Sequence, residues 1–288
     1  MTADIRIRPA TLDDVAGADA VARDVLYRPP LGTDEARRRR RSHARIAHLI
    51  ETDPGGAWVA ERADGRIAGI ALALVREGVW GFSLFGVAED LQGRGVGRRL
   101  LEASYDYGAS AGAVGHIILS SESPAAMRRY SRLGLPLRPA VAAAGIADLS
   151  HLPDAAARVE EAGEAGIAPA DTIGRRVRGA GHGRDLPVAL AGGARLLLFE
   201  DRAFAVLRDS NVMLLAGVDE EAASTVLWAA FHRAGPGATI GVDFLTAGQD
   251  WAVRTCLDAG LALSPDGPMF AGGRLGPMTP YIPSGSYL

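Results

Sequence analysis

The stretch that decides the fold of this chain reads Val87-Ala-Glu-Asp-Leu-Gln92-Gly93-Arg94-Gly95-Val96-Gly97-Arg98-Arg99-Leu-Leu. Residues 82–87 form an apolar segment typical of a strand, and an acidic connector, a glycine-rich turn and an amphipathic helix follow it. Glycines remove side chains where backbone N–H groups must crowd around an anion, and the helix directs the positive end of its dipole at the same place. The stretch therefore predicts a cradle for phosphate.

The spacing of the glycines excludes two common phosphate-binding loops. The pattern G-x-x-x-x-G-K-[ST] is absent, and the chain contains no lysine at all. The dinucleotide pattern G-x-G-x-x-G is also absent, because the glycines stand at 93, 95 and 97. The pattern that fits is Q-x-x-G-x-G, which begins at Gln92.

A second motif lies in a helix that the sequence predicts over residues 124–133 and that Gly134 closes. The helix carries A-x-x-x-Y-x-x-x-G-[FL], with Ala126, Tyr130, Gly134 and Leu135 at the matching positions. Together the two motifs resemble those of the GNAT N-acetyltransferase superfamily. The resemblance extends over about residues 4–140, with the strands and helices in the family's order.

The resemblance implies that acetyl-CoA is the acyl donor. The main chain near Phe85 to Val87 would pair with the pantetheine arm, and N–H groups from Gln92 to Arg98 would hold the pyrophosphate. Ser123 replaces the asparagine that the family usually has at the start of the Tyr130 helix. The implied cofactor-binding residues are Phe85, Val87, Gln92, Gly93, Arg94, Gly95, Val96, Gly97, Arg98, Arg99 and Ser123. Among these, Arg94, Arg98 and Arg99 would neutralise phosphate charge.

The implied reaction is transfer of an acetyl group to an amine by direct attack, without a covalent enzyme intermediate. A phenol with a pKa near ~10 can protonate the departing thiolate, so Tyr130 is the candidate general acid. The family frequently carries a glutamate base where this chain has Gly81. Ser83, which strand alternation places on one face with Gly81 and Phe85, is the second catalytic candidate because it could order a water. A water relay, an amine that arrives neutral, and acyl-CoA binding without fast turnover all stay open.

Composition limits the other classes of function. The chain has 288 residues, of which 48% are hydrophobic, and is more natural as two domains than as one. Its formal net charge of -3 provides no field that would recruit nucleic acid or a membrane surface. The single cysteine, Cys256, excludes an internal disulfide framework and is typical of a cytoplasmic protein. His182 has no second histidine or cysteine at metal spacing, so no metal site is expected.

The chain also contains a second, degraded copy of its own pattern. With Gly134 aligned to Gly260, an offset of 126 residues, seven positions between 119 and 139 are identical. Val87 aligns with Val218 at an offset of 131, so the second copy has lost five residues inside the loop. The deletion removes every loop glycine and leaves Asp219-Glu-Glu, whose carboxylates would repel a pyrophosphate. The sequence thus predicts a second copy that kept the fold and lost the cofactor.

The expected fold class is α/β, with two GNAT-like domains, each a twisted, mostly antiparallel mixed sheet with flanking helices, and an acyl-CoA cleft in the first. The expected domains are 1–145 (acetyl-CoA-binding and catalytic), 146–194 (connector) and 195–288 (degenerate copy with a Pro/Gly-rich tail). The expected helices cover 12–25, 34–51, 97–111, 124–133, 154–165, 220–234 and 249–259. The expected strands are 5–8, 57–62, 66–76, 79–87, 115–120, 195–200, 203–208, 212–218 and 238–244. The tail is expected to lie across a surface or cleft.

Two other functions stay open beside acetyl transfer. Because Gly81 stands at the base position, the chain could be a non-catalytic acyl-CoA-binding sensor or scaffold. Aminoacyl transfer from a charged tRNA is a third possibility, against which the CoA loop and the net charge argue. The arginine run 37–41 with Arg45 is expected to be a solvated helix face. The sequence does not choose between a small-molecule and a peptide amine as acceptor, or between a monomer and a homodimer.

Overall fold

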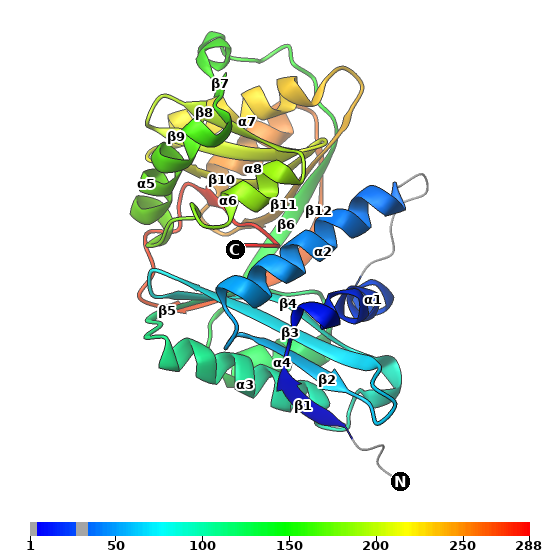
Figure 1. The fold of residues 1–288 in the computed structure, drawn as a ribbon. Helices are drawn as coiled ribbons and strands as arrows, with labels where there is room; N and C mark the ends of the chain where they lie inside the picture. The colour runs from blue at the N-terminus through cyan, green and yellow to red at the C-terminus, as the bar shows by residue number, and fades with distance from the viewer. Residues whose placement is uncertain (1–4, 27–33) are drawn as a thin grey trace. The chain divides into compact units, whose positions relative to one another are not determined.

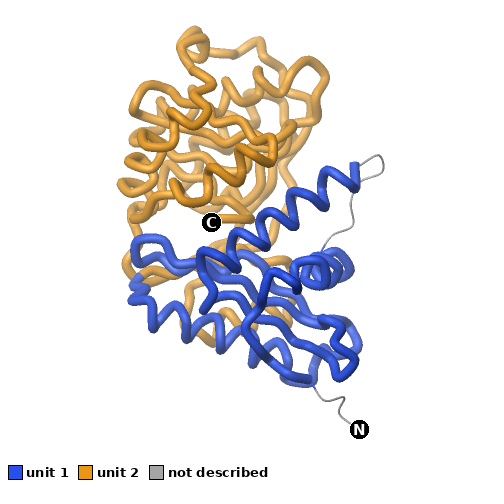
Figure 2. The backbone as a smooth tube through the Cα atoms, in the orientation of Figure 1, with its two compact units in different colours: residues 1–114 blue, residues 115–288 orange. Residues whose placement is uncertain are grey.

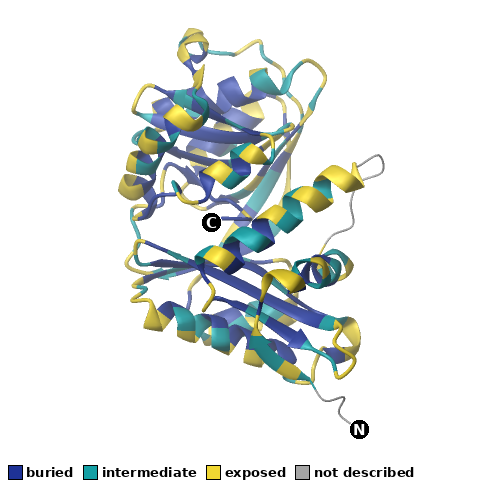
Figure 3. Ribbon diagram, viewed as in Figure 1, coloured by how far each residue is buried: buried dark blue, intermediate teal, exposed yellow. Residues whose placement is uncertain are grey.

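The computed structural model describes residues 5–26 and 34–288. The chain divides into two compact units, residues 1–114 and 115–288 (Figure 2). Residue 4 and residues 27–33 of the acetyltransferase-like stretch lie outside the described residues. Buried residues line many strands of both units, and in unit 2 they also line the helix of residues 220–234 (Figure 3).

Unit 1 is an antiparallel sheet in the order β1-β2-β3-β4. Its elements are β1 (Arg6–Pro9), the 3-10 turn Leu12–Asp14, α1 (Val15–Leu26), α2 (Glu35–Thr52), β2 (Ala57–Glu61), β3 (Ile67–Arg76), β4 (Val79–Val87), the 3-10 turn Glu89–Leu91 and α3 (Val96–Ser110). Helices α1 and α2 cover one face of this sheet and α3 the other (Figure 1), which buries β3 on both sides. The strands and helices predicted for this part of the chain are confirmed within one or two residues, except that the helix predicted from residue 12 begins at Val15 after a 3-10 turn.

Strand β4 contains a bulge at Ser83. Leu84 pairs with Leu72 and Phe82 pairs with Ala73, so the register shifts by one residue at Ser83. The extra residue shifts the alternation of side chains on either side of it. The rings of Phe82 and Phe85 consequently lie on one face, with centroids 5.2 Å apart. The prediction that strand alternation places Gly81 and Phe85 on one face with Ser83 is wrong, because the bulge puts Gly81 and Phe85 on opposite faces.

The arginine face of α2 is also less solvated than predicted. Asp34 caps the helix by accepting from the amide of Arg37 at 2.9 Å. Arg37 is exposed, Arg41 is half-buried and Arg45 is only 9% exposed. The prediction of a solvated face is therefore wrong for Arg45, which is buried.

A buried carboxylate ties three elements of unit 1 together. Asp53 follows α2 and accepts hydrogen bonds from the Val75 amide at 2.9 Å and the Arg76 guanidinium at 2.8 Å, both on β3. It also accepts from the Tyr107 hydroxyl of α3 at 2.9 Å. Asp53 is 1% exposed and Arg76 is 5% exposed. The ion pair thus holds the helices on the two faces of the sheet to the same point of β3.

Unit 2 is a longer mixed sheet in the order β5-β12-β6-β11-β10-β9-β8-β7, with β13 on β10. Within the units, the strands of the described residues pair antiparallel except β10 and β11, which run parallel. The strands are β5 (Gly115–Leu119), β6 (Leu137–Ile146), β7 (Glu160–Glu161), β8 (Ala194–Phe199), β9 (Ala203–Arg208), β10 (Asn211–Gly217), β11 (Thr239–Thr246), β12 (Ala262–Gly273) and β13 (Tyr281–Ile282). The helices are α4 (Pro124–Arg132), α5 (Ile167–Arg178), α6 (Leu186–Ala191), α7 (Glu220–Ala234) and α8 (Asp250–Asp258).

Strand β12 lies between β5 and β6. It pairs with β5 from Met269 to Gly273 and with β6 from Ala262 to Phe270, antiparallel in both cases. Strand β6 in turn pairs with β11 on its other edge. Segments more than a hundred residues apart in sequence are thereby interleaved in one sheet. The expected fold class, an α/β fold with a mixed sheet, is confirmed.

The secondary structure of residues 146–194, the predicted connector, differs from the prediction. The helix expected over 154–165 is wrong, because this span holds two 3-10 turns, Asp154–Arg158 and Gly163–Gly166, with β7 between them. Gly163 has a φ of +53°, which an α-helix does not accommodate. The α-helix of this region is α5, which begins at Ile167. His182, in the loop after α5, is fully buried.

We predict that Asp53→Ala lowers the free energy of unfolding by about 3–5 kcal/mol, because it leaves the buried Arg76 guanidinium without its counter-charge. Urea unfolding followed by circular dichroism measures this loss. The double variant Asp53→Ala/Arg76→Met should recover part of the loss, since it removes both charges of this pair. A loss below about 1 kcal/mol for Asp53→Ala, as at an exposed pair, would contradict the role given to this ion pair.

Candidate acyl-CoA loop and catalytic tyrosine

The turn between β4 and α3 is held by its own short-range hydrogen bonds. The Gln92 side chain donates to the carbonyl of Val87 at 3.0 Å and so ties the turn back to the end of β4. The amide of Leu91 bonds to Ala88 at 2.9 Å, and the Leu91 side chain is buried beneath the turn. The loop is therefore a fixed structure on top of the unit 1 core.

Two glycines in this turn have backbone conformations that other residues disfavour. Gly93 has a φ of +77° and Gly95 has a φ of +84°. A side chain at either position would meet no atom within 4 Å, so packing does not require glycine there. The requirement is conformational, because the left-handed region is open to glycine at little cost. These two residues turn the chain sharply into α3.

The first turn of α3 presents backbone N–H groups that no side chain caps. Gly95 occupies the N-cap position and has no side chain to bond to them. The first intrahelical bond runs from the Arg99 amide to the Gly95 carbonyl at 3.2 Å, so the amides of residues 96–98 lie before it. The first turn also carries no acidic residue. An anion placed here would meet both free donors and the positive end of the helix dipole.

The three arginines predicted to contact phosphate lie at or next to this end of α3. Arg94 is exposed, Arg98 lies 3.8 Å from Glu102, and Arg99 donates to the carbonyl of Ile5 at 3.4 Å. The acidic connector is partly neutralised, because Arg62 pairs with Asp90 at 2.7 Å and this hydrogen bond lowers the pKa of Asp90. The charge around the turn is thus positive, while the binding role of the three arginines stays a prediction.

The strand that leads into the turn supplies the other predicted residues of unit 1. Ser83, at the bulge, is 8% exposed; Phe85 is half-buried; Val87 is buried and ends β4. Unit 1 therefore gathers most of the predicted site residues on one strand–turn–helix: Ser83, Phe85, Val87, Gln92, Gly93, Arg94, Gly95, Val96, Gly97, Arg98 and Arg99. Two residues that contact the turn, Leu91 and Arg62, were not predicted from the sequence. The apolar Leu91 within an acidic connector was a usable signal, whereas the pairing of Arg62 across 28 residues had none.

Helix α4 of unit 2 carries the remaining two predicted residues. Tyr130 is 4% exposed, and its ring packs edge-on against Phe270 of β12 with centroids 5.5 Å apart. Burial raises the pKa of Tyr130 above its usual value, so the phenol keeps its proton at neutral pH. Ser123 is exposed at the N-cap position of α4, and its side chain makes no capping hydrogen bond there. The side chain of Ser123 is thus not used to close its own helix.

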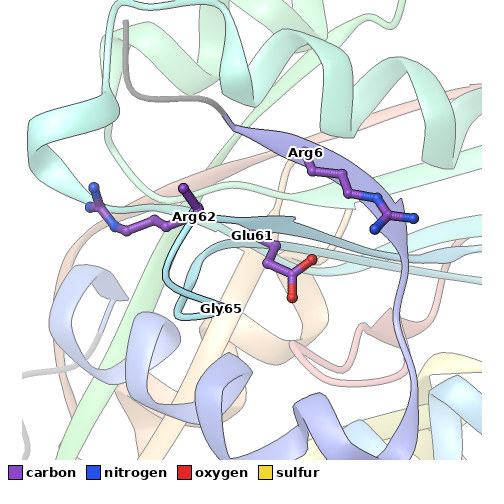
Figure 4. A pocket seen from close by; sticks show the side chains of 5 residues that line it. Arg6, Glu61, Arg62 and Gly65 are labelled. Atoms are coloured by element: carbon purple, nitrogen blue, oxygen red, sulfur yellow. The ribbon is translucent and has the colours of Figure 1, made fainter.

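Metal and membrane-spanning sites are absent from residues 5–26 and 34–288, the part of the chain that the structure describes. In them no group of three or more His, Cys, Asp or Glu side chains could hold a metal ion, and no helix is long and apolar enough to span a membrane. A hollow of about 530 Å³ lies at the β2–β3 hairpin, where Arg6 and Arg62 point away from each other (Figure 4). A second, of about 420 Å³, lies along α2 at Glu35, Arg39, Arg40 and His43. Neither hollow is lined by the turn or by Tyr130.

We predict that Gly95→Ala lowers the free energy of unfolding by about 1 kcal/mol, because it forces a Cβ into the left-handed region. Gly65→Ala is the matched control, since Gly65 has a φ of +82° and equally open surroundings in the β2–β3 hairpin. Thermal or urea unfolding should give similar losses for the two variants. A much larger loss for Gly95→Ala would mean that packing, and not backbone conformation, fixes the glycine.

The turn and the tyrosine motif lie in a span whose sequence matches a known protein family. Residues 24–135 match the acetyltransferase (GNAT) family in sequence. This span contains the glycine-rich turn and ends at the last residue of the tyrosine motif. No curated protein is similar enough to the chain in sequence to count as a match.

Solved structures extend the likeness to the fold of the chain. A putative acetyltransferase from Pyrococcus horikoshii has a TM-score of 0.79 at 17% identity, over 99% of this chain and 96% of that one. A GCN5-related N-acetyltransferase from Kribbella flavida has a TM-score of 0.60 at 18% identity, over 93% and 71%. One from Sphaerobacter thermophilus has a TM-score of 0.55 at 14% identity, over 94% and 96%. Residues 24–135 thus resemble the GNAT acetyltransferases in sequence, and the chain resembles acetyltransferases in fold.

Proposed function

We propose that this protein is an N-acetyltransferase that carries an acetyl group from acetyl-CoA to an amine. The observation that carries the proposal is the uncapped N-terminus of α3, which follows two glycines of positive φ within a span that matches the acetyltransferase family. In this proposal, the amides of residues 96–98 bind the pyrophosphate of acetyl-CoA. Arg94, Arg98 and Arg99 add positive charge at the rim.

The acyl arm of acetyl-CoA is proposed to lie along the end of β4. The main chain near Phe85 and Val87 would pair with the amides of pantetheine as an added strand would. Ser123, whose hydroxyl does not cap α4, would supply one further polar contact. The bulge at Ser83 supports this arrangement, because bulges bend a strand and end its regular pairing.

The proposed chemistry is one direct displacement. The amine nitrogen attacks the thioester carbonyl carbon, the carbon–sulfur bond breaks, and the thiolate of CoA takes a proton from the Tyr130 hydroxyl. The raised pKa of Tyr130 supports this role, since the phenol is fully protonated when the thiolate leaves. The proton lost by the amine passes to water, which Ser83 would help to order, or the amine arrives neutral.

A covalent route through the chain's own thiol has no support. Cys256 lies in α8, is fully buried, and burial raises its pKa to about 12. The nucleophilic thiolate form is therefore scarce at neutral pH. This favours direct attack by the amine.

The second half of the chain is proposed to be a degenerate copy of the first. Helix α8 begins and ends 126 residues after α4, and a glycine of φ +79° or +73° follows each at Gly134 and Gly260. The amide of Gly134 bonds to Ser131 at 3.0 Å, and that of Gly260 bonds to Leu257, its counterpart, at 2.9 Å. We assign the copies to 1–145 and 195–288, with 146–194 as connector.

Helix α7, the counterpart of α3 in this proposal, is capped and surrounded by its own charged side chains. Asp219 caps it and accepts from the amide of Ala222 at 2.8 Å. Arg202 pairs with Asp219 at 2.9 Å and with Glu221 at 3.1 Å. In α7 the amide of Ala222 is thus bonded to Asp219, and carboxylates stand where α3 has none, which supports one acetyl-CoA per chain.

The acceptor is proposed to be a small-molecule or peptide amine, with the reaction in the cytoplasm, without nucleic acid or membrane, and in a monomer or homodimer. Gly81, which lies where the family frequently has a glutamate base, favours a second candidate: an acyl-CoA-binding sensor or scaffold without turnover. Release of CoA thiol in the presence of a panel of amines separates the two. Saturable acetyl-CoA binding with no thiol release for any amine would support the sensor.

We predict that Tyr130→Phe lowers kcat by about 10²–10⁴-fold, the usual contribution of a positioned acid, with little change in the Kd for acetyl-CoA. The wild-type rate should show no loss from Tyr130 deprotonation up to about pH 10, because its pKa is raised above the usual value. Steady-state kinetics and calorimetric titration measure the two quantities.

Tyr105→Phe, a change of the same kind on α3, is the control and should leave kcat unchanged. Equal losses in both tyrosine variants, or a Tyr130→Phe enzyme of normal kcat, would remove Tyr130 from the mechanism.

A further inference from the structure

Strands β10 and β11 separate soon after they begin. They pair only at Asn211 with Gly241 and at Val212 with Val242. Beyond this point β10 pairs instead with β13: Leu215 lies opposite Ile282 and Ala216 opposite Tyr281. The amide of Gly217 also donates to the carbonyl of Pro280 at 3.2 Å. Beyond Val212, β10 is therefore paired with the main chain of residues 280–282. These belong to residues 276–288, here called the covering segment.

The part of β10 that is covered has a definite counterpart in the first half. At the offset of 131 residues that aligns Val87 with Val218, residues 215–217 correspond to residues 84–86. Residues 84–87 include the stretch whose main chain is proposed to pair with pantetheine. Both strands also carry a bulge near this stretch, at Ser83 in β4 and at Met213 in β10, one position apart at this offset. The covering segment thus lies on the second copy of the proposed pantetheine edge.

A buried side chain at the start of α8 holds the covering segment. Gln249 is 2% exposed, donates to the Met278 carbonyl at 2.7 Å and accepts from the Tyr281 amide at 3.0 Å. The indole of Trp251 donates to the same amide oxygen at 2.9 Å and fixes its orientation. Gln249 lies 126 residues after Ser123, at the N-cap of the corresponding helix. The residue that is proposed to touch pantetheine in one half has a counterpart that binds peptide in the other.

The far end of the covering segment is held by a buried cation and a buried phenol. Arg178, 1% exposed, donates to the main-chain oxygens of Tyr287 and Leu288, as well as to those of Ala180 and Gly181. The Tyr281 hydroxyl donates to the Leu288 oxygen at 2.8 Å and lies 3.0 Å from Nε2 of His182. All these side chains are buried in unit 2, so the segment is seated in a formed slot. It is more enclosed than the expected position across a surface or cleft.

We propose that the slot beside β10 is a peptide-binding site derived from an acyl-CoA site, and that residues 276–288 occupy it in place of a pantetheine arm. This inference rests on the proposed function, since it takes the two halves as copies of one acetyl-CoA-binding fold. In the second half, the peptide pairs with β10 where pantetheine would pair with β4 in the first half. Gln249 makes the contact that corresponds to that of Ser123, and the Asp219 carboxylate stands at the N-terminus of α7 where the pyrophosphate would stand at α3. The second half thus binds an extended peptide and leaves acetyl-CoA to the first half.

The test is amide hydrogen exchange followed by mass spectrometry on the full chain, with and without acetyl-CoA. The amides of residues 278–288 should exchange slowly without ligand and should not change when acetyl-CoA protects residues 92–99. Faster exchange of residues 278–288 on addition of acetyl-CoA, together with two bound equivalents per chain, would overturn the proposal. Failure of acetyl-CoA to protect residues 92–99 would instead count against the proposed function, because slow exchange of the covering segment does not require the ligand.

Two matched variants test the correspondence between the halves. Gln249→Ala should raise the exchange rate of residues 278–284 by about tenfold or more and leave the Kd for acetyl-CoA unchanged, because it removes hydrogen bonds to the covering segment only. Ser123→Ala should weaken acetyl-CoA binding and leave the exchange of the covering segment unchanged. Unaltered exchange of residues 278–284 in a folded Gln249→Ala protein would contradict the proposal.

A second measurement applies if Gln249→Ala does not fold. A protease site placed at the exposed Arg274 allows the intact chain to fold before it is cut. The released segment should stay bound after cleavage and exchange slowly with a labelled synthetic peptide of residues 276–288 at one per chain. Immediate loss of the segment, with no rebinding of the synthetic peptide, would overturn the peptide site.

Discussion

The interleaving of β12 between β5 and β6 is the constraint on which unit 2 depends. Strand β5 cannot complete its pairing until residues 269–273 reach it, and β6 is held between β12 and β11. The sheet therefore joins strands from the start and the end of unit 2. Without β12, β5 and β6 would each leave one edge without a paired strand. Helix α4, which carries Tyr130, packs its tyrosine ring on Phe270 of this same β12. The position of Tyr130, the candidate acid, thus depends on a strand that lies more than a hundred residues further along the sequence.

Helices α3 and α7, which correspond in the proposed pair of copies, differ at their N-termini. In α3 a glycine of positive φ occupies the N-cap position and leaves the first amides open to an anion. In α7 Asp219 takes that position and satisfies an amide with its own carboxylate. The N-terminus of a helix can bind either the anion of a ligand or a carboxylate of the chain itself, since both accept hydrogen bonds from the first amides. If the two halves are copies, as proposed, a loop shorter by five residues and without the glycines would account for the difference between the two helix ends.

Much of unit 1 could be predicted from sequence, because its strands are apolar runs and its helices have clear periodicity and caps. The loop was predictable as well, since positive φ at Gly93 and Gly95 needs glycine. Strands β6 and β12 were missed, because Ala142 to Ala144 and Ser264 to Pro268 have low strand propensity and pair only through tertiary contacts. The Ser83 bulge and the Asp53–Arg76 pair were equally hidden, because each depends on a partner strand that no local pattern specifies.

Calorimetric titration with acetyl-CoA tests the central claim most directly, applied to the protein and to a Gly95→Glu/Gly97→Glu variant. The account predicts one binding site per chain, and no binding to the variant, because two carboxylates would then stand at the N-terminus of α3. Circular dichroism and the unfolding midpoint establish that the variant is folded. Absence of binding to the parent protein, or equal binding to a folded variant, would contradict the assignment of the β4–α3 turn as the acetyl-CoA site.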